Sequence, residues 1–524
     1  MTATVTAATR RTAGWLAAAF ALLYLATGGG RIVGSDEVTM AELSRALLTG
    51  GIAVPEGATL DGRDGRHYSK NHAGQAVLAL PWTLAGEAAA RILPFAPARK
   101  TLVARAVVST FNAFVAALLV AVLYAAARGL GASAGAALGA AVLLGLATPI
   151  WVYSKSFMAE PLQSLGLMVA LWGATRAASA DERLRDRAGE RLAALGVFLA
   201  ISAKLSQLPL ALACLLPLWG APLARALWPF AGLGAALAGH LLYNAARFGT
   251  PLESGYGAQA SFAAYSTPIL VGLYGLLVSS GKGVLWFAPA LWLAVPGWAA
   301  MRRNRAHGAG VPARREAAAR GALAIAAVWL VTLALFASFE HWAGDGSFGP
   351  RYLIPALAPG LLGVAFALNH ASRARRRLAW ILGTLGLLVQ LGGVAIYFGA
   401  QMREAGDYPY TRSLSDPHFM SESHFNPRFS PIAGHWAMLW RNAGDHLAGD
   451  LPRIGAGGTP DPRLGISVED QRALLGALDF WWTYARYAGI PAVPVLGALA
   501  ALLAGLAFAI QRLRRAFRDE ARGA

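Results

Sequence analysis

The chain alternates between long apolar blocks and shorter polar connections. Most blocks have roughly the length that an α-helix needs to cross the hydrocarbon core of a membrane, about 20 residues. They fall at about 14–28, 101–127, 132–149, 158–177, 192–204, 206–220, 228–247, 283–300, 320–338, 353–369, 379–399 and 491–511. The pattern predicts an all-α polytopic membrane protein with about 12 transmembrane helices.

The composition excludes a soluble enzyme. Of the 524 residues, 56% are hydrophobic and only 14% are charged. A soluble protein carries about 25% charged residues, which it needs to cover its surface. The single cysteine, Cys214, leaves no partner for an intrachain disulfide, so any segment outside the cytoplasm must fold without one.

Basic residues concentrate on alternate connections between the apolar blocks. These connections hold Arg10 and Arg11, Arg128, Arg183 to Arg191, Arg225, Arg302 to Arg320, Arg373 to Arg377, and Arg512 to Arg522. Loops rich in Lys and Arg stay in the cytoplasm, so both termini are expected there. This topology accounts for most of the net charge of +18 and makes a nucleic-acid partner unnecessary.

The other connections are longer and are expected on the external face, at 29–100, 150–157, 248–282, 339–352 and 400–490. Within the loop 29–100, the segments 36–49 and 73–93 have the apolar spacing of helices that lie along a membrane surface. The chain thus divides into a core, 1–400, a loop or small cap, 401–490, and a last helix with a basic tail, 491–524.

Acidic residues stand at the external ends of two predicted spans. Asp36 and Glu37 follow the first span, and Glu160 opens the fourth. A carboxylate there can accept a proton or bind a cation, and burial beside lipid is costly enough that such residues tend to be functional. The alternatives are a helix start at Asp36 and Glu37, and a structural ion pair between Glu160 and Lys155.

Basic residues on the same face are candidates for binding phosphate. Arg351 opens the tenth predicted span, where it runs against the positive-inside bias and can grip phosphate with two N–H groups. Lys282 lies among small residues that let the backbone approach an anion. Arg247, at the end of the seventh span, and Lys70, in the first external loop, complete this group.

Five further residues are candidate contacts to a substrate or to a metal ion: His67, Tyr68, His72, His341 and Asp345. Histidine and carboxylate side chains are metal ligands, but their spacing here matches no specific metal motif. For His67 taken alone, a solvated loop is the favoured explanation. The metal, if any, stays open, with Mg²⁺ or Mn²⁺ as the expected divalent cation.

In motif order and topology, residues 14–400 resemble the membrane-embedded GT-C glycosyltransferases, in particular bacterial relatives of protein O-mannosyltransferases and of the aminoarabinose transferases of lipid A. The resemblance rests on short motifs, all on the expected external face. They are Asp36-Glu37, Tyr68-x-Lys70, Glu160, Tyr243-Asn244-x-x-Arg247-Phe248-Gly249 and Gly344-Asp345-Gly346-Ser347-x-Gly349-Pro350-Arg351-Tyr352.

The resemblance implies a hexosyl- or pentosyltransferase in the cytoplasmic (inner) membrane of a bacterium. Its donor would be a sugar linked to polyprenyl phosphate, and its acceptor an envelope lipid, glycan or protein. The acidic residue after the first span, Asp36 or Glu37, would lie next to the reacting centre. Arg351, with Lys282 or Arg247, would hold the lipid phosphate.

Two other classes of function remain open. A transporter or flippase of a lipid-linked glycan predicts facing polar residues deep inside the spans, for which His240 and Lys204 are the main candidates. A non-catalytic membrane protein of envelope assembly predicts that Asp36, Glu37 and Arg351 do not converge on a shared cavity.

Overall fold

The computed structural model describes residues 6–57, 59–93, 97–178, 186–257, 261–303, 312–407, 412, 416, 418, 420–455 and 467–522. Parts of two basic connections expected in the cytoplasm, 183–185 and 304–311, lie outside the described residues. The same holds for parts of the predicted cap, 401–490.

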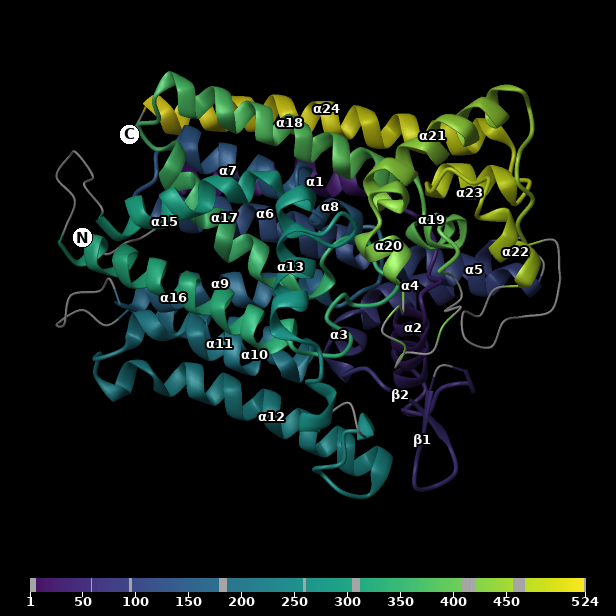
Figure 1. The fold of residues 1–524 in the computed structure, drawn as a ribbon, viewed down its shortest axis with the longest axis horizontal. Helices are drawn as coiled ribbons and strands as arrows, with labels where there is room; N and C mark the ends of the chain where they lie inside the picture. Colours follow the sequence, from purple (N-terminus) through teal and green to yellow (C-terminus); the bar gives the residue numbers. More distant parts are fainter. Residues whose placement is uncertain are drawn as a thin grey trace.

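A bundle of helices forms the body of the protein (Figure 1). Its longer helices are α1 (Ala7–Ala26), α6 (Phe111–Gly129), α7 (Ala134–Leu146), α9 (Glu160–Ala178), α10 (Arg187–Ala203), α12 (Leu227–Phe248), α15 (Ala294–Arg303), α16 (Pro312–Ala337), α17 (Ile354–Leu368), α18 (Arg373–Ala395) and α24 (Ala492–Arg522). Shorter pieces are α8 (Ile150–Tyr153), α11 (Leu208–Cys214), α13 (Ile269–Val278) and α14 (Val284–Phe287). Both chain termini lie at one end of the bundle, which we call the termini end.

The remaining elements gather towards the opposite end (Figure 1). From the first loop these are α2 (Ser35–Leu47), β1 (Thr59–Asp61), β2 (His67–Ser69), α3 (Ala73–Leu78), α4 (Leu80–Ile92) and α5 (Pro97–Val108). From the C-terminal part they are α19 (Phe398–Glu404), α20 (Ser421–Phe425), α21 (Pro431–Leu447), α22 (Val468–Ala473) and α23 (Trp481–Tyr487). The helices predicted at 36–49 and 73–93 are therefore present as α2 and as α3 with α4, and their position at a membrane surface stays a prediction.

A small antiparallel hairpin departs from the predicted all-α architecture. β1 and β2 pair with Leu60 opposite Tyr68. The turn between them includes Gly65, whose φ of +73° suits glycine because it has no Cβ. Strands of three residues are too short to show the alternation of polar and apolar positions that marks a strand in a sequence.

Five helices among the described residues are long and apolar enough to cross a membrane: Arg99–Gly129, Glu316–Ala337, Arg351–Leu368, Arg373–Ala395 and Ala492–Arg522. The predicted number of 12 spans stays a prediction. One reason for the difference is local, because the predicted spans at 192–204 and 206–220 are interrupted by extended backbone at Lys204 and continue only as the short α11.

Small residues bring the helices α9 and α10 into close contact. A Cβ atom on Gly196 would lie 2.1 Å from the backbone nitrogen of Ala170, and one on Gly173 would lie 2.2 Å from that of Ala193. Any side chain at these glycines would push the two backbones apart. Close approach at small residues is the usual way in which membrane helices gain packing contacts.

The first and last helices are joined at the termini end. α24 packs along α1, and its buried Glu520 accepts a hydrogen bond from Thr9 Oγ1 at 2.7 Å. The same carboxylate accepts bonds from Tyr124 Oη and Arg128 Nε of α6, each at 2.7 Å. One carboxylate thus connects three helices that lie far apart in the sequence.

Candidate active site

A cluster of buried charges lies where three helical segments begin. Asp36 is in the first turn of α2, Glu160 is the first residue of α9, and Arg351 opens the 3₁₀ turn that leads into α17. Arg351 Nε donates to Glu160 Oε1 at 2.6 Å, and Nη2 donates to Asp36 Oδ2 at 2.8 Å. The planar guanidinium therefore bridges the two carboxylates, which a single ammonium cannot do in the same way.

Two lysines complete this charge cluster. Lys70, just after β2, places Nζ 3.0 Å from Asp36 Oδ1 and is still partly exposed. Lys204, at the end of α10, lies close enough that its charge acts on both Asp36 and Glu160. Counting Arg351, the cluster holds three cations and two carboxylates, so one positive charge is left over for an anionic ligand.

The environment of Asp36 favours its ionised form. Burial raises the pKa of this carboxyl, but the charges of Lys70, Arg351 and Lys204 outweigh burial and hold the pKa well below its usual range. The start of α2 acts in the same direction, because a helix N-terminus stabilises negative charge. Asp36 therefore carries a negative charge at neutral pH.

Glu37 has a different environment from its neighbour. Its Oε2 accepts from the backbone N–H of Gly34 at 2.9 Å, which caps α2, and its Oε1 accepts from that of Phe157 at 2.5 Å. Burial raises the pKa of this carboxyl. Glu37 thus joins the start of α2 to the turn before α9, and it is not part of the Arg351 cluster's hydrogen bonds.

Lys155 is not the partner of Glu160, contrary to the structural ion pair that the sequence suggested. The two residues face different clusters, because Glu160 opens α9 towards Arg351 while Lys155 lies in the preceding turn. Lys155 Nζ donates to the carbonyl oxygen of Val394 at 2.6 Å and pairs with Asp479 Oδ2 at 3.0 Å.

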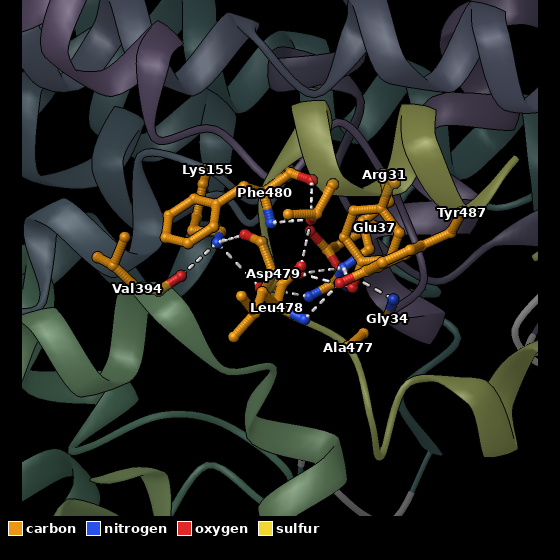
Figure 2. Close-up of polar contacts among 12 residues, drawn as sticks. Arg31, Gly34, Glu37, Lys155, Val394, Ala477, Leu478, Asp479, Phe480 and Tyr487 are labelled. Atoms are coloured by element: carbon orange, nitrogen blue, oxygen red, sulfur yellow. Dashed lines mark hydrogen bonds and ion pairs between the residues drawn. The ribbon is translucent and has the colours of Figure 1, made fainter. Parts of the chain in front are cut away.

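A second buried cluster is built around Asp479 (Figure 2). Arg31 grips this carboxylate with two N–H groups, at 2.6 and 2.8 Å, and Lys155 binds it from the other side. Tyr484 Oη donates to Asp479 at 2.9 Å, and the Arg31 guanidinium lies over the ring of Tyr397, 4.0 Å from its centre. The cluster joins the segment after α1, the turn before α9 and the segment before α23.

The pKa values follow from these contacts. Burial raises the pKa of Asp479, but the charges of Arg31 and Lys155 outweigh it and hold the pKa below its usual range. For Lys155 burial prevails and lowers the pKa to about 8. A cavity of about 40 Å³, enough for a few water molecules, separates this cluster from Glu37 and Tyr153.

Arg247 and Tyr68 stabilise the hairpin loop. Arg247 Nη1 donates to the carbonyl oxygen of Ser69 at 2.7 Å, and its guanidinium lies 4.0 Å from the ring centre of Tyr243. Tyr68 donates to Asp64 at 2.7 Å. His67 lies on the hairpin beside the exposed Asp61, at 2.9 Å. None of these contacts involves the Arg351 cluster.

Lys282, His341 and Asp345 meet in the loop before Arg351. Lys282 Nζ donates to the backbone carbonyls of Asp345 at 2.9 Å and Ser347 at 2.7 Å, so this lysine holds the loop that carries Arg351. Burial lowers its pKa to about 7. His341 Nδ1 lies 3.2 Å from Asp345 Oδ1, and this hydrogen bond raises the pKa of the histidine.

His72 packs against another histidine. Its ring lies 4.3 Å from that of His240, edge to face, and 6.3 Å from that of Tyr256. Burial lowers the pKa of His72, and the nearby His240 acts in the same direction. The ring is therefore neutral at neutral pH.

A divalent cation has no ready-made site in the described part of the chain. No group of three or more His, Cys, Asp or Glu side chains is placed there to hold a metal ion. The two carboxylates of the Arg351 cluster already pair with cations.

An apolar groove of about 920 Å³ runs between α1, α5, α23 and α24. Its walls are mostly apolar, and Arg31 and Arg99 are its charged lining residues. Because Arg31 also lines the small cavity beside Glu37, this arginine stands between the apolar groove and a cavity that charged side chains reach. Such a boundary suits a ligand that joins a lipid chain to a charged group.

No family model matches the chain, and neither does any curated protein. A structural likeness was found to ArnT from Cupriavidus metallidurans bound to undecaprenyl phosphate, with 17% sequence identity and a TM-score of 0.50, over 88% of this chain and 77% of that one. The chain has the GT-C fold. The same ArnT in the apo state gives 18% identity and a TM-score of 0.49, over 90% of this chain and 77% of that one.

AglB, an archaeal oligosaccharyltransferase from Archaeoglobus fulgidus in complex with an inhibitory peptide and a dolichol-phosphate, gives 12% identity and a TM-score of 0.41, over 74% of this chain and 57% of that one. The GT-C fold and the five apolar helices make the chain an integral membrane protein. The GT-C architecture expected from the sequence is thereby confirmed, while the roles of individual residues stay predictions.

Three charged residues of the two clusters were not expected there from the sequence: Lys204 beside the Arg351 cluster, and Arg31 and Asp479 in the second cluster. Arg31 carries the same signal as Arg351, an arginine expected on the external face against the positive-inside bias. Asp479 is an acidic residue directly before an aromatic run, Phe480 to Trp482. For Lys204 the sequence suggests only a polar residue inside a transport path.

Proposed function

We propose that this protein transfers a sugar from a polyprenyl-phosphate donor to an envelope acceptor at the outer face of the cytoplasmic membrane of a bacterium. The donor sugar is a hexose or a pentose, and the acceptor is a lipid, a glycan or a protein. The observation that carries the proposal is the meeting of Asp36, Glu160 and Arg351 in one largely buried cluster, with the partly exposed Lys70 at its edge.

The surplus positive charge of this cluster supports a phosphate site. A donor phosphate that binds Arg351 and Lys70 competes with Asp36 for the same cations. As these contacts move from Asp36 to the phosphate, the pKa of Asp36 rises from its depressed value. Binding of the donor thus turns a weak base into a stronger one at the moment when a base is needed.

The transfer is then a single displacement. The acceptor oxygen or nitrogen attacks the anomeric carbon, its proton passes to Asp36, and the bond between that carbon and the phosphate oxygen breaks. The electron pair leaves with the polyprenyl phosphate, whose charge Arg351 and Lys70 stabilise. One displacement inverts the configuration at the anomeric carbon.

Glu160 and Glu37 act on the arrangement in different ways. Glu160 orients Arg351 through the 2.6 Å contact, and its Oε2 is buried without a hydrogen-bond partner among the described residues. This free oxygen is available to a sugar hydroxyl. Glu37 keeps Asp36 in register with the turn before α9 through its two backbone contacts.

The apolar groove that includes Arg31 supports a lipid-linked donor, because a polyprenyl chain needs an apolar surface near the site. The basic connections predict that both termini are cytoplasmic. The helix α2, whose first turn holds Asp36, lies towards the end of the bundle opposite the termini (Figure 1), which supports a site at the outer face. The pair of carboxylates that Arg351 bridges favours an enzyme. A transporter or an assembly protein would have no evident use for such a pair.

The test is transfer from a radiolabelled polyprenyl-phosphate sugar pool in membranes with and without the protein. Asp36→Asn should abolish transfer while the folded protein still binds donor, although the loss of this charge between Lys70 and Arg351 lowers its thermal stability. The matched control is Asp61→Asn, which changes an exposed carboxylate on the hairpin. Full transfer by the Asp36→Asn variant would exclude Asp36 as the base.

A further inference from the structure

A second apolar groove lies between α7 and α18, and its lining includes no residue of the candidate active site. It has a volume of about 630 Å³. Apolar and small side chains make up most of its lining, among them Gly139, Leu143, Leu146, Trp380, Gly383 and Leu387. Volumes of this size are typical of pockets that bind small molecules or lipid chains.

The groove opens towards the surrounding lipid. α18 is one of the helices that are apolar and long enough to cross a membrane, and two thirds of its apolar window is not buried inside the protein. Trp380, on the groove, is 78% exposed, and Ile381 next to it is 57% exposed. In a membrane these surfaces contact acyl chains.

One end of the groove is polar and basic. Ser133, His370 and Arg376 line it there, at the termini end where α7 and α18 both begin. Arg376 belongs to an exposed run of four arginines that also holds Arg373, Arg375 and Arg377. None of the four pairs with a carboxylate of the described residues.

The length of the groove fits one leaflet. On α7 it extends from Ser133 to Ala147, which at 1.5 Å per residue is about 21 Å. One leaflet measures about 20–22 Å when its headgroup region is included. A phospholipid whose headgroup lies at the arginines therefore fills the groove, and its acyl chain ends near the middle of the membrane.

We propose that this groove binds one anionic glycerophospholipid of the leaflet at the termini end. Its phosphate lies against Arg376 and the neighbouring arginines, and one acyl chain lies in the groove between α7 and α18. The occupant is a phospholipid rather than a free phosphate because the polar end continues directly into the apolar part. Basic pockets between membrane helices are the usual sites for such headgroups.

The experiment measures bound lipid on the full-length protein by native mass spectrometry, after exchange into an equimolar mixture of phosphatidylglycerol and phosphatidylcholine. The wild-type protein should retain phosphatidylglycerol preferentially. Arg376→Gln should lower this preference by about fivefold, the effect of one arginine near an anionic surface. Glycerol phosphate at the same concentration should not displace the lipid.

A second variant tests the apolar part. Gly135 lines the groove, and a Cβ atom there would meet nothing within 4 Å, so Gly135→Trp fills the groove near its basic end without a clash. It should release the bound lipid. Gly497→Trp is the matched control, because Gly497 on α24 is equally free of neighbours and lies outside the groove.

Three results would overturn the proposal. They are equal retention of the two phospholipids by the wild-type protein, wild-type retention of phosphatidylglycerol by Gly135→Trp, and displacement of phosphatidylglycerol by polyprenyl phosphate. The last would assign the groove to the carrier lipid. The thermal unfolding midpoint of each variant shows that a lost lipid does not reflect a lost fold.

Discussion

Replacing Asp479 by Asn should destabilise the protein more than any other single amide substitution of a carboxylate in the C-terminal part. The Asp479 side chain is 4% exposed, and its partners Lys155 and Arg31 are 5% and 15% exposed. Removing one member of a buried ion pair costs about 3–5 kcal/mol, because it leaves an uncompensated charge. The neutral amide would leave two such cations, so we expect a loss at the upper end of this range at neutral pH.

The loss should depend on pH in a definite direction. In the wild-type protein Lys155 has a pKa of about 8, below the value of about 10.4 in an unfolded chain. Without the Asp479 charge the folded-state pKa falls further. Between pH 6 and 8 the unfolded variant then binds more protons than the folded variant, so its stability rises with pH. The difference in the free energy of unfolding between the variant and the wild type should therefore become smaller from pH 6 to pH 8.

Chemical denaturation in detergent, followed by tryptophan fluorescence at pH 6 and pH 8, measures both effects. Trp481 and Trp482 donate to the carbonyls of Leu25 and Ala26, so their fluorescence reports on the packing of the segment after Asp479 against the end of α1. Asp470→Asn is the control, a buried carboxylate that accepts from the backbone of Gly455. The reasoning would be refuted if Asp479→Asn had the same free energy of unfolding as the control. It would also be refuted if the difference in this free energy between Asp479→Asn and the wild type increased with pH.

The other predictions concern the candidate site and its supports. The depressed pKa of Asp36 stabilises the folded protein. This stabilisation is fully present above the pKa of an unfolded Asp, about 3.9, and is lost as the pH falls towards the pKa of Asp36 in the folded protein. The free energy of unfolding should therefore depend less on pH in Asp36→Asn than in the wild type under acid conditions. Arg351→Lys should slow transfer at least about 100-fold, because an ammonium cannot bridge Asp36 and Glu160 as the guanidinium does; a wild-type rate in the membrane assay would exclude this role. Gly30→Ala should cost about 1–3 kcal/mol in chemical denaturation, since Gly30 has a φ of +62° and a Cβ there would lie 2.5 Å from Trp481 Cβ. Transfer should be unchanged after EDTA treatment and after adding back Mg²⁺ or Mn²⁺, because Arg351 and Lys70 stabilise the charge of the phosphate; a rate that is lost with EDTA and restored by the metal would show that a metal ion is needed.

The sequence predicted a large part of the candidate site, because topology alone places residues on one face. Asp36, Glu160 and Arg351 come from segments more than a hundred residues apart, yet each stands at the external end of a predicted span. Since ends of spans on the same side of a membrane share one plane, the three could be expected near one another. Their mutual contacts depend on helix packing, which no local pattern encodes.

Lys282 and Arg247 show why position alone is not enough. Both were expected to bind phosphate on the same grounds as Arg351. In the structure, the Lys282 ammonium donates to backbone carbonyls, and Arg247 donates to the backbone of the hairpin loop at Ser69. Whether a cation faces a ligand or its own backbone is decided by the path of irregular loops, which the sequence does not specify.

The Arg31–Asp479 pair was missed for a different reason. The two residues are 448 positions apart. The segment 400–490 shows little apolar periodicity from which Asp479 could be placed. A pair of this kind can be recognised only from the folded structure. The apolar pattern also did not predict the break at Lys204, where the backbone becomes extended inside an apolar run.

The carboxylate of Glu520 has a consequence for biosynthesis. Its partners Thr9, Tyr124 and Arg128 are synthesised almost 400 residues or more before it. The first helix therefore enters the membrane long before α24 exists, and until then α6 is the neighbour against which it packs. The contacts between α1 and α24 consequently form last, and a ribosome that stops before residue 492 releases a chain in which α1 can pack on α6 but lacks α24.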